Sequence, residues 1–236
     1  TPPFEQQFVR KEKIELLGNE IEMVDVRPGH AKSEVPVLFA PGWGSTPETF
    51  KDALRVMAEE GRRTLSLAQP RRGWEMKKAS AEHGNKFPEE ELRKAFALIA
   101  LLWAKGVKKA DVVAHSEAGI NVAIAASIAP ERFRNIVFVD PGGLIGKDSF
   151  PALFKRFAAD AVRDGIRMLF GTAEPQEIFR LGRAGKETVH YFFQNPARAL
   201  KEASAISKSD IRNMLKDLHN RGMGIAVMQS VDDPVF

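Results

Sequence analysis

The chain has 236 residues, of which 44% are apolar and 28% charged, with no cysteine and a net charge of +4. This length and composition predict one globular unit with a sizeable core, and they exclude a disulfide framework, a thiolate zinc site and a cysteine nucleophile. The longest apolar run, residues 95–104, is shorter than the ~20 residues that a membrane-spanning helix needs. Basic residues occur as scattered pairs among acidic ones, which is typical of a solvated surface and argues against nucleic-acid binding. The lack of cysteine favours the cytoplasm, and the start at Thr1 leaves room for a removed leader.

The first 61 residues predict a hairpin followed by a strand, a loop and a helix. Residues 8–17 and 20–26 alternate loosely between apolar and polar around Gly18-Asn19, which is typical of a β-hairpin. Residues 35–40 form an apolar run suited to a strand buried on both faces of a parallel sheet. The run leads into Pro41-Gly42-Trp43-Gly44-Ser45, and we expect the next helix to have Thr46 as its N-cap and to end at Gly61.

The middle of the chain continues the alternation of strands with helices. We expect strands at 63–67, 110–115 and 136–139, one helix from Pro88 to Gly106, and another that ends at Pro130. The apolar face expected for the first of these helices is Leu92, Ala95, Phe96, Ile99, Leu102 and Trp103. Strands alternating with helices predict an α/β fold with a parallel sheet covered on both faces.

Residues 110–119, Ala-Asp-Val-Val-Ala-His-Ser-Glu-Ala-Gly, indicate a strand, a sharp turn and a helix. At such a turn the serine takes a strained conformation that exposes its hydroxyl, and the residues two before and two after it, Ala114 and Ala118, must be small. The amide of Glu117 and the positive end of the helix dipole would face negative charge that develops on a substrate oxygen. The alternative is that Ser116 only caps a buried helix.

The order of these motifs resembles the α/β-hydrolase superfamily over nearly the whole chain. The resemblance rests on the hairpin, the loops at 41–44 and 69–74, the serine turn and Val139-Asp140-Pro141-Gly142-Gly143-Leu144. It implies a mostly parallel, doubly wound sheet with Ser116 as nucleophile, although alanine replaces both glycines of the usual G-x-S-x-G. The backbone amides of Trp43 and Glu117 would form the oxyanion hole, with Gly42 beside the substrate. Gly42 and Gly44 would form a tight loop that needs positive φ.

Between residues 144 and 208 the strands stop and the pattern becomes helical throughout. The resemblance therefore implies a core at 1–144, an all-helical cap at 145–208 and the second part of the core at 209–236. Phe154 and Phe157 belong to a recurring apolar stripe of the cap, which packs the cap on the core or lines an apolar substrate pocket. We assign His190 a structural role.

The last part of the chain predicts a helix capped by Ser209, a buried strand at 225–228 and an acidic turn. Members of the superfamily carry Gly-x-x-Asp after this strand, and with Ser230 in the glycine position the acid of the triad is Asp233. Asp232 and Asp140 are reserve candidates. The resemblance implies a histidine base after the acid, whereas no histidine follows Asp233 and a last strand and helix are missing. We therefore expect the natural protein to continue past Phe236 and to carry its histidine there.

These observations favour a serine hydrolase that cleaves a carboxylic ester or related acyl compound with an apolar group, through an acyl-enzyme. We expect a small-molecule substrate and no metal or other cofactor. Branches that use aspartate as nucleophile are disfavoured, whereas esterase, lipase, thioesterase, aminopeptidase, carbon–carbon bond hydrolase and cofactor-free haloperoxidase stay open. A non-catalytic binding protein that lacks the base is the alternative from another class. A scaffold that uses the cap as a docking face is the third reading.

Overall fold

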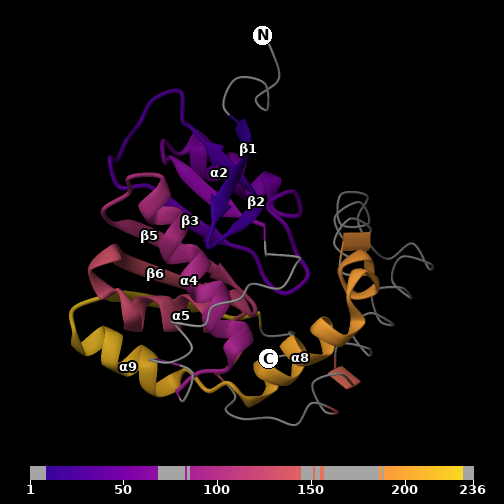
Figure 1. Cartoon of the computed structure of the whole chain (residues 1–236). Coiled ribbons are helices and arrows are strands. Elements are labelled where there is room, and N and C mark those ends of the chain that lie inside the picture. Colours follow the sequence, from indigo (N-terminus) through magenta and orange to yellow (C-terminus); the bar gives the residue numbers. More distant parts are fainter. Residues whose placement is uncertain are drawn as a thin grey trace.

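The computed structural model describes residues 9–68, 83, 86–144, 151, 155–156, 186–187 and 189–230. The described strands form one seven-stranded sheet in the order β1-β2-β4-β3-β5-β6-β7 (Figure 1). The strands are β1 (Val9–Leu16), β2 (Asn19–Val26), β3 (Val37–Ala40), β4 (Thr64–Leu67), β5 (Ala110–His115), β6 (Phe133–Val139) and β7 (Gly224–Met228). The helices are α2 (Lys51–Glu59), α4 (Glu89–Ala104), α5 (Ala118–Ile128), α8 (Pro196–Lys208) and α9 (Arg212–Asn220), with a 3₁₀ turn η1 (Pro130–Arg132).

The sheet is mixed and mostly parallel, as the sequence predicted. β1 and β2 form the expected hairpin, and β2 pairs antiparallel with β4. From β4 onward every neighbouring pair is parallel. Because the carboxyl ends of parallel strands meet at one edge of a sheet, the loops after β3, β5, β6 and β7 come together there.

Helices cover both faces of the sheet, and β5 shows how the sequence divides between them. Ala110, Val112 and Ala114 face the larger core, which packs under α4, α5 and α9. Val113 points the other way, into a smaller core that α2 covers with Leu54. This alternation places α4 and α5 on one face and α2 on the opposite one (Figure 1).

Two expected helix caps are wrong. α2 begins at Lys51, because the residues from Thr46 to Phe50 make i to i+3 hydrogen bonds, such as that from the Thr49 amide to the Thr46 carbonyl at 3.1 Å. Thr46 therefore caps a tight turn that precedes the helix. Ser209 ends α8 and does not begin α9, since its hydroxyl donates to the Ala205 carbonyl at 2.9 Å.

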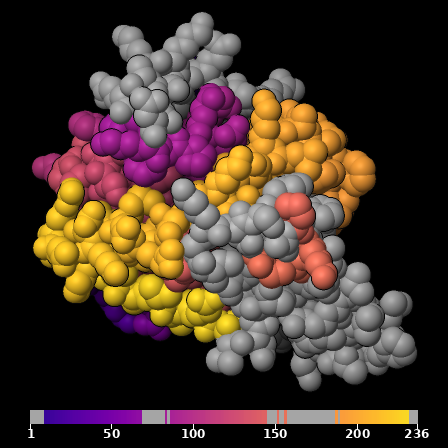
Figure 2. Space-filling model, turned by 90° about the horizontal axis from the view of Figure 1, so that it is seen from below, coloured from indigo at the N-terminus to yellow at the C-terminus, as the bar shows by residue number. Residues whose placement is uncertain are grey.

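The expected burial of Trp103 and of β7 is also wrong. Trp103 is 64% exposed, because the buried side of α4 is centred on Leu98 and Leu101. The Arg132 guanidinium lies over the exposed indole, with its Cζ 3.7 Å from the ring centroid. Most of β7 is exposed, including Met228 at 60%. β7 pairs only with β6, and within the described ranges no further strand joins it, so it lies at the surface beside α9 (Figure 2).

An ion cluster around Asp111 fastens the amino end of β5. Arg62 donates to its carboxylate at 2.6 Å and Arg134 at 2.5 and 2.8 Å, while Asn135 adds a hydrogen bond at 2.9 Å. Partial burial opposes ionisation, but these hydrogen bonds outweigh it and lower the pKa of Asp111 to about 2.

Replacement of Asp111 by asparagine removes the charge that pairs with Arg62 and Arg134 and is expected to lower the free energy of unfolding by about 1 kcal/mol at pH 7. The loss is no larger because solvent screens this partly exposed cluster. A carboxylate whose folded pKa lies below its unfolded value of 3.8 stabilises the protein above that value. The difference should therefore shrink as the pH falls from about 4 towards about 2. Urea unfolding at pH 7 and pH 3 measures it, with Asp217→Asn on the exposed side of α9 as the control. An equal loss at both pH values would contradict this account.

Candidate active site

Ser116 follows β5 in a left-handed backbone conformation, with φ +56°. Its amide donates to the Val139 carbonyl at 2.9 Å, and its carbonyl accepts from the Gly119 amide at 2.9 Å and the Gly142 amide at 3.0 Å. A non-glycine residue persists in this region only when its surroundings hold it there. Three backbone hydrogen bonds therefore fix the strained turn, and the Ser116 side chain stays half-buried.

The residues around Ser116 are small because the turn brings segments close together. Ala114 and Ala118 are buried on either side of it. A Cβ atom added to Gly119 would lie 2.8 Å from the Cβ of Pro141, closer than real Cβ contacts come. The loop after β6 therefore packs directly on the first turn of α5, which requires the glycine.

The loop after β3 lies against the serine turn. A Cβ atom added to Gly42 would lie 2.9 Å from the Cβ of Ser116 and 3.1 Å from the His115 carbonyl oxygen. Trp43 follows Gly42 directly, and Glu117 follows Ser116, so the two amides expected to form an oxyanion hole belong to adjoining turns. Gly44 has the expected positive φ of +69°. Gly42 does not have a positive φ. Glycine is required there because an added Cβ atom would have no room, and not because of the backbone conformation.

Asp140 lies in the loop after β6, at the same edge of the sheet. Its φ is +44°, its amide donates to the Met228 carbonyl at 2.8 Å, and its Oδ1 accepts from the Ser230 amide at 2.6 Å. Asp140 thus joins the ends of β6 and β7. The other candidate acids, Asp232 and Asp233, lie outside the described residues, as do Phe154 and Phe157.

The histidines have neighbours of their own. The His115 ring packs against Phe50 with ring centroids 4.9 Å apart. His190 contacts Gln194 at 2.8 Å, and His219 lies in the last turn of α9. In the described part of the chain, none of these three contacts or positions joins a histidine to Ser116.

Sequence reasoning missed a buried charged cluster beside these turns. Glu91, Lys94, Glu117 and Glu202 are each no more than 4% exposed. Burial, followed by the neighbouring Glu117 carboxylate, raises the pKa of Glu91 well above its usual value. A signal was present, because Glu91 and Lys94 share the helical phase of Leu98 and Leu101 and therefore fall on the buried side of α4.

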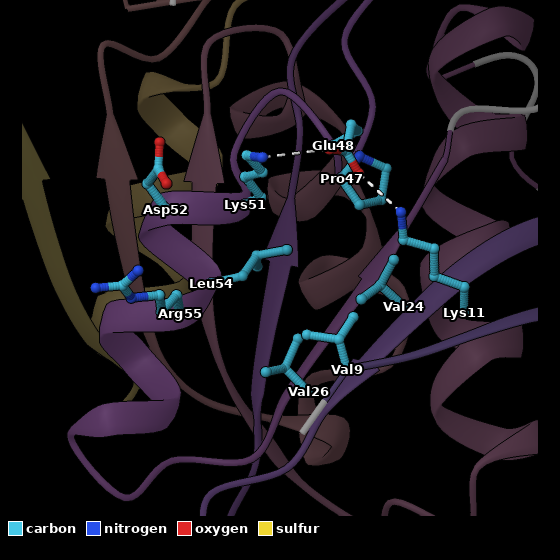
Figure 3. A pocket seen from close by; sticks show the side chains of 10 residues that line it. All are labelled: Val9, Lys11, Val24, Val26, Pro47, Glu48, Lys51, Asp52, Leu54 and Arg55. Carbon is cyan, nitrogen blue, oxygen red and sulfur yellow. Dashed lines mark hydrogen bonds and ion pairs between the residues drawn. The ribbon is translucent and has the colours of Figure 1, made fainter. Parts of the chain in front are cut away.

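A hollow of about 420 Å³ lies away from Ser116, between the β1–β2 hairpin and α2 (Figure 3). Apolar side chains such as Val24, Val26 and Leu54 line it. The charges at its rim compensate one another, since Lys11 pairs with Glu48 at 2.9 Å. Ser116, Trp43, Glu117 and Asp140 are not among the residues that line it.

Metal-ligand clusters and membrane-length helices are both absent from residues 9–68, 83, 86–144, 151, 155–156, 186–187 and 189–230. No group of three or more histidine, aspartate or glutamate side chains there is arranged to hold a metal ion. Every helix within those ranges is too short or too polar to cross a bilayer.

The architecture is similar to that of several solved hydrolases. A hydrolase from Oleispira antarctica matches with a TM-score of 0.60 and 16% identity, covering 91% of this chain and 77% of that one. A serine hydrolase from Cycloclasticus zankles matches with a TM-score of 0.59 and 15% identity, covering 96% and 92% respectively. An N-formylmaleamic acid deformylase from Pseudomonas putida S16 matches with a TM-score of 0.61 and 15% identity, covering 94% and 82%.

No protein-family model and no curated protein matches the sequence. The likeness to known proteins is therefore one of fold. The chain has the fold of the α/β-hydrolase superfamily, which confirms the resemblance seen in its motifs.

Proposed function

We propose that the protein is a serine hydrolase that cleaves a carboxylic ester or related acyl compound with an apolar group. The observation that carries the proposal is the strained turn at Ser116, held against the Gly42 loop at the edge of the sheet where strand ends converge. Structural similarity to hydrolases of varied activity supports hydrolysis in general. The choice of serine chemistry rests on the residue at the turn.

In this proposal, the Ser116 Oγ attacks the substrate carbonyl carbon and the carbonyl oxygen becomes negative. The amides of Trp43 and Glu117 stabilise that oxygen, each donor being worth about 3 kcal/mol in comparable sites. A histidine takes the serine proton and returns it to the leaving group, which departs and leaves an acyl-enzyme. Water then attacks the acyl group with the same base, and the acid product leaves. Asp233 orients the histidine, with Asp232 and Asp140 as reserves.

The nucleophile is tested by labelling the full natural protein with a fluorophosphonate and mapping the modified peptide by mass. We expect the label on Ser116, and its loss in Ser116→Ala. Absence of a label from the folded protein would contradict a serine hydrolase and favour a binding protein that keeps the fold without the base.

The substrate class follows from the aromatic character of residues 145–208, which we propose form a cap over the site with Phe154 and Phe157 facing the substrate. Medium-chain and aromatic p-nitrophenyl esters should therefore have kcat/KM values about tenfold or more above that of the acetate, because each buried methylene adds about 0.8 kcal/mol. Initial rates over a chain-length series measure this. A preference for the acetate would contradict the apolar pocket.

A further inference from the structure

The indole of Trp43 is tied to a buried carboxylate. Its Nε1 donates to Glu202 Oε2 at 2.9 Å, and its ring meets that of Tyr191 edge to face, with centroids 6.4 Å apart. The indole is held by side chains that come from another part of the chain, between residues 189 and 208. The backbone amide of the same residue lies next to Gly42, in the loop that packs on Ser116. A contact that fixes the indole therefore fixes the loop that carries this amide.

Glu202 is equipped to remain charged although it is buried in α8. Its carboxylate accepts from the Tyr191 hydroxyl and pairs with Arg198 at 2.9 Å, and Lys94 Nζ lies 3.7 Å away. Burial opposes ionisation, but Lys94 and Arg198 outweigh it and lower the pKa of Glu202. Trp43 therefore donates to a full negative charge, which makes a shorter and stronger hydrogen bond than a neutral acceptor would.

Lys94 continues the connection to the serine turn. It is 4% exposed and forms a buried ion pair with Glu117. Burial lowers the pKa of Lys94, but the Glu117 and Glu202 carboxylates raise it by more. Lys94 therefore keeps its ammonium form. A continuous chain of contacts thus runs from Trp43 through Glu202 and Lys94 to Glu117. Its two ends are the residues whose amides form the proposed oxyanion hole.

Opposite charges face one another in this cluster. Lys94 and Arg198 carry two positive charges, opposite the carboxylates of Glu117 and Glu202. The third acid, Glu91, is fully buried, and burial beside the Glu117 carboxylate raises its pKa, which favours its neutral form. Its Oε2 accepts from the Asn121 amide at 2.7 Å when that amide is oriented to satisfy both groups. Buried charges that pair with one another can stay buried, whereas removal of one partner would leave an uncompensated charge.

A second carboxylate holds the far side of the same loop. Glu187 Oε2 accepts from the Thr46 amide at 3.1 Å, from the Thr46 hydroxyl at 2.9 Å and from the Thr49 hydroxyl. Like Glu202, it belongs to the segment 186–208, of which the α8 part packs on α4. The loop that carries the Trp43 amide is therefore hydrogen-bonded at two points, Trp43 and Thr46, to side chains of the segment 186–208.

We propose that Glu202 is a positioning residue that sets the oxyanion hole, holding Trp43 through its indole and Glu117 through Lys94, with Glu187 as a second clamp on the Trp43 loop. This assignment rests on the proposed function for its chemical consequence. The position of the Trp43 loop is a separate property that can be measured in the absence of turnover.

The test compares Glu202→Gln with Trp43→Phe and with the double variant in the full natural protein. Exchange of the Trp43 backbone amide with deuterium should accelerate in Glu202→Gln. Phosphonylation of Ser116 should slow about tenfold or more, because small displacements of catalytic groups have effects of that size. The KM for an ester should change much less than kcat. Both substitutions act on the same contact, which Glu202→Gln weakens by removing the charge and Trp43→Phe removes, so the double variant should be no slower than the slower single variant.

The control is Glu60→Gln, which removes an exposed carboxylate of the ion pair with Lys32 and should leave exchange and phosphonylation as in the wild type. Wild-type exchange at Trp43 in Glu202→Gln, or losses that multiply in the double variant, would overturn the assignment. If Glu202→Gln does not fold, Trp43→Phe gives the same readouts, and wild-type rates there would overturn it equally. An unlabelled wild type would defeat the proposed function, while amide exchange would still decide whether Glu202 holds the loop.

Discussion

Replacement of Ser116 by alanine is expected to lower kcat/KM for ester hydrolysis by about 10⁴-fold or more, because no other group would form the acyl-enzyme. Three backbone hydrogen bonds hold the turn, and none uses the Ser116 side chain. Alanine can occupy the same strained conformation, so the melting temperature should change little. Initial rates and thermal unfolding measure the two effects.

The matched control for this substitution is Ser127→Ala in α5, where the hydroxyl donates to the Ala123 carbonyl at 2.8 Å. It removes a serine hydroxyl from the helix that follows the Ser116 turn and should leave kcat/KM unchanged. Full hydrolytic activity in Ser116→Ala would exclude Ser116 as the nucleophile. A fall in activity matched by a loss of folded protein would assign the residue a structural role.

Replacement of Gly42 by alanine should inactivate the site through steric overlap alone. The new Cβ would lie 2.9 Å from Ser116 Cβ and 3.1 Å from His115 Nδ1, so the loop and the serine turn must move apart. A shift of about 1 Å in a catalytic group costs about 100-fold in rate. Overpacking of this kind also costs about 1–3 kcal/mol of stability. Phosphonylation rate and urea unfolding measure the two losses.

Gly18→Ala provides the comparison for Gly42→Ala. Gly18 has a φ of +76° in the β1–β2 turn, with nothing within 4 Å of an added Cβ. Alanine there should cost about 1 kcal/mol of stability through strain and leave the activity of the folded protein intact. If Gly42→Ala also kept full activity, the proposed contact between the two turns would have no catalytic importance.

Features that depend on neighbouring residues in the chain could be predicted from the sequence. The turn at Ser116 was recognisable because its small residues occupy fixed offsets, and the strain expected there takes the form of a left-handed conformation in the structure. The parallel order of strands was predictable for a similar reason, since apolar runs alternate with helical patterns. Both depend on local spacing, which the amino-acid order displays directly.

Features that depend on distant partners could not be predicted in the same way. Glu202 is buried because it meets Lys94 and Trp43, which lie more than 100 positions earlier in the chain. α2 begins later than predicted because the residues after Thr46 make i to i+3 hydrogen bonds, and the Glu187 carboxylate accepts a hydrogen bond from the Thr46 hydroxyl. The apolar composition of β7 suggested burial, but its exposure depends on which elements lie beside it. Tertiary context decided each of these outcomes.

In the proposed mechanism, the Ser116 oxygen and two backbone amides, those of Trp43 and Glu117, act on one substrate carbonyl. A crystal structure of the fluorophosphonate-treated protein tests it most directly. We expect phosphorus bonded to Ser116 Oγ, with the phosphoryl oxygen about 2.7–3.1 Å from both amide nitrogens. A phosphonyl group on another residue, or one on Ser116 whose oxygen points away from these amides, would contradict it.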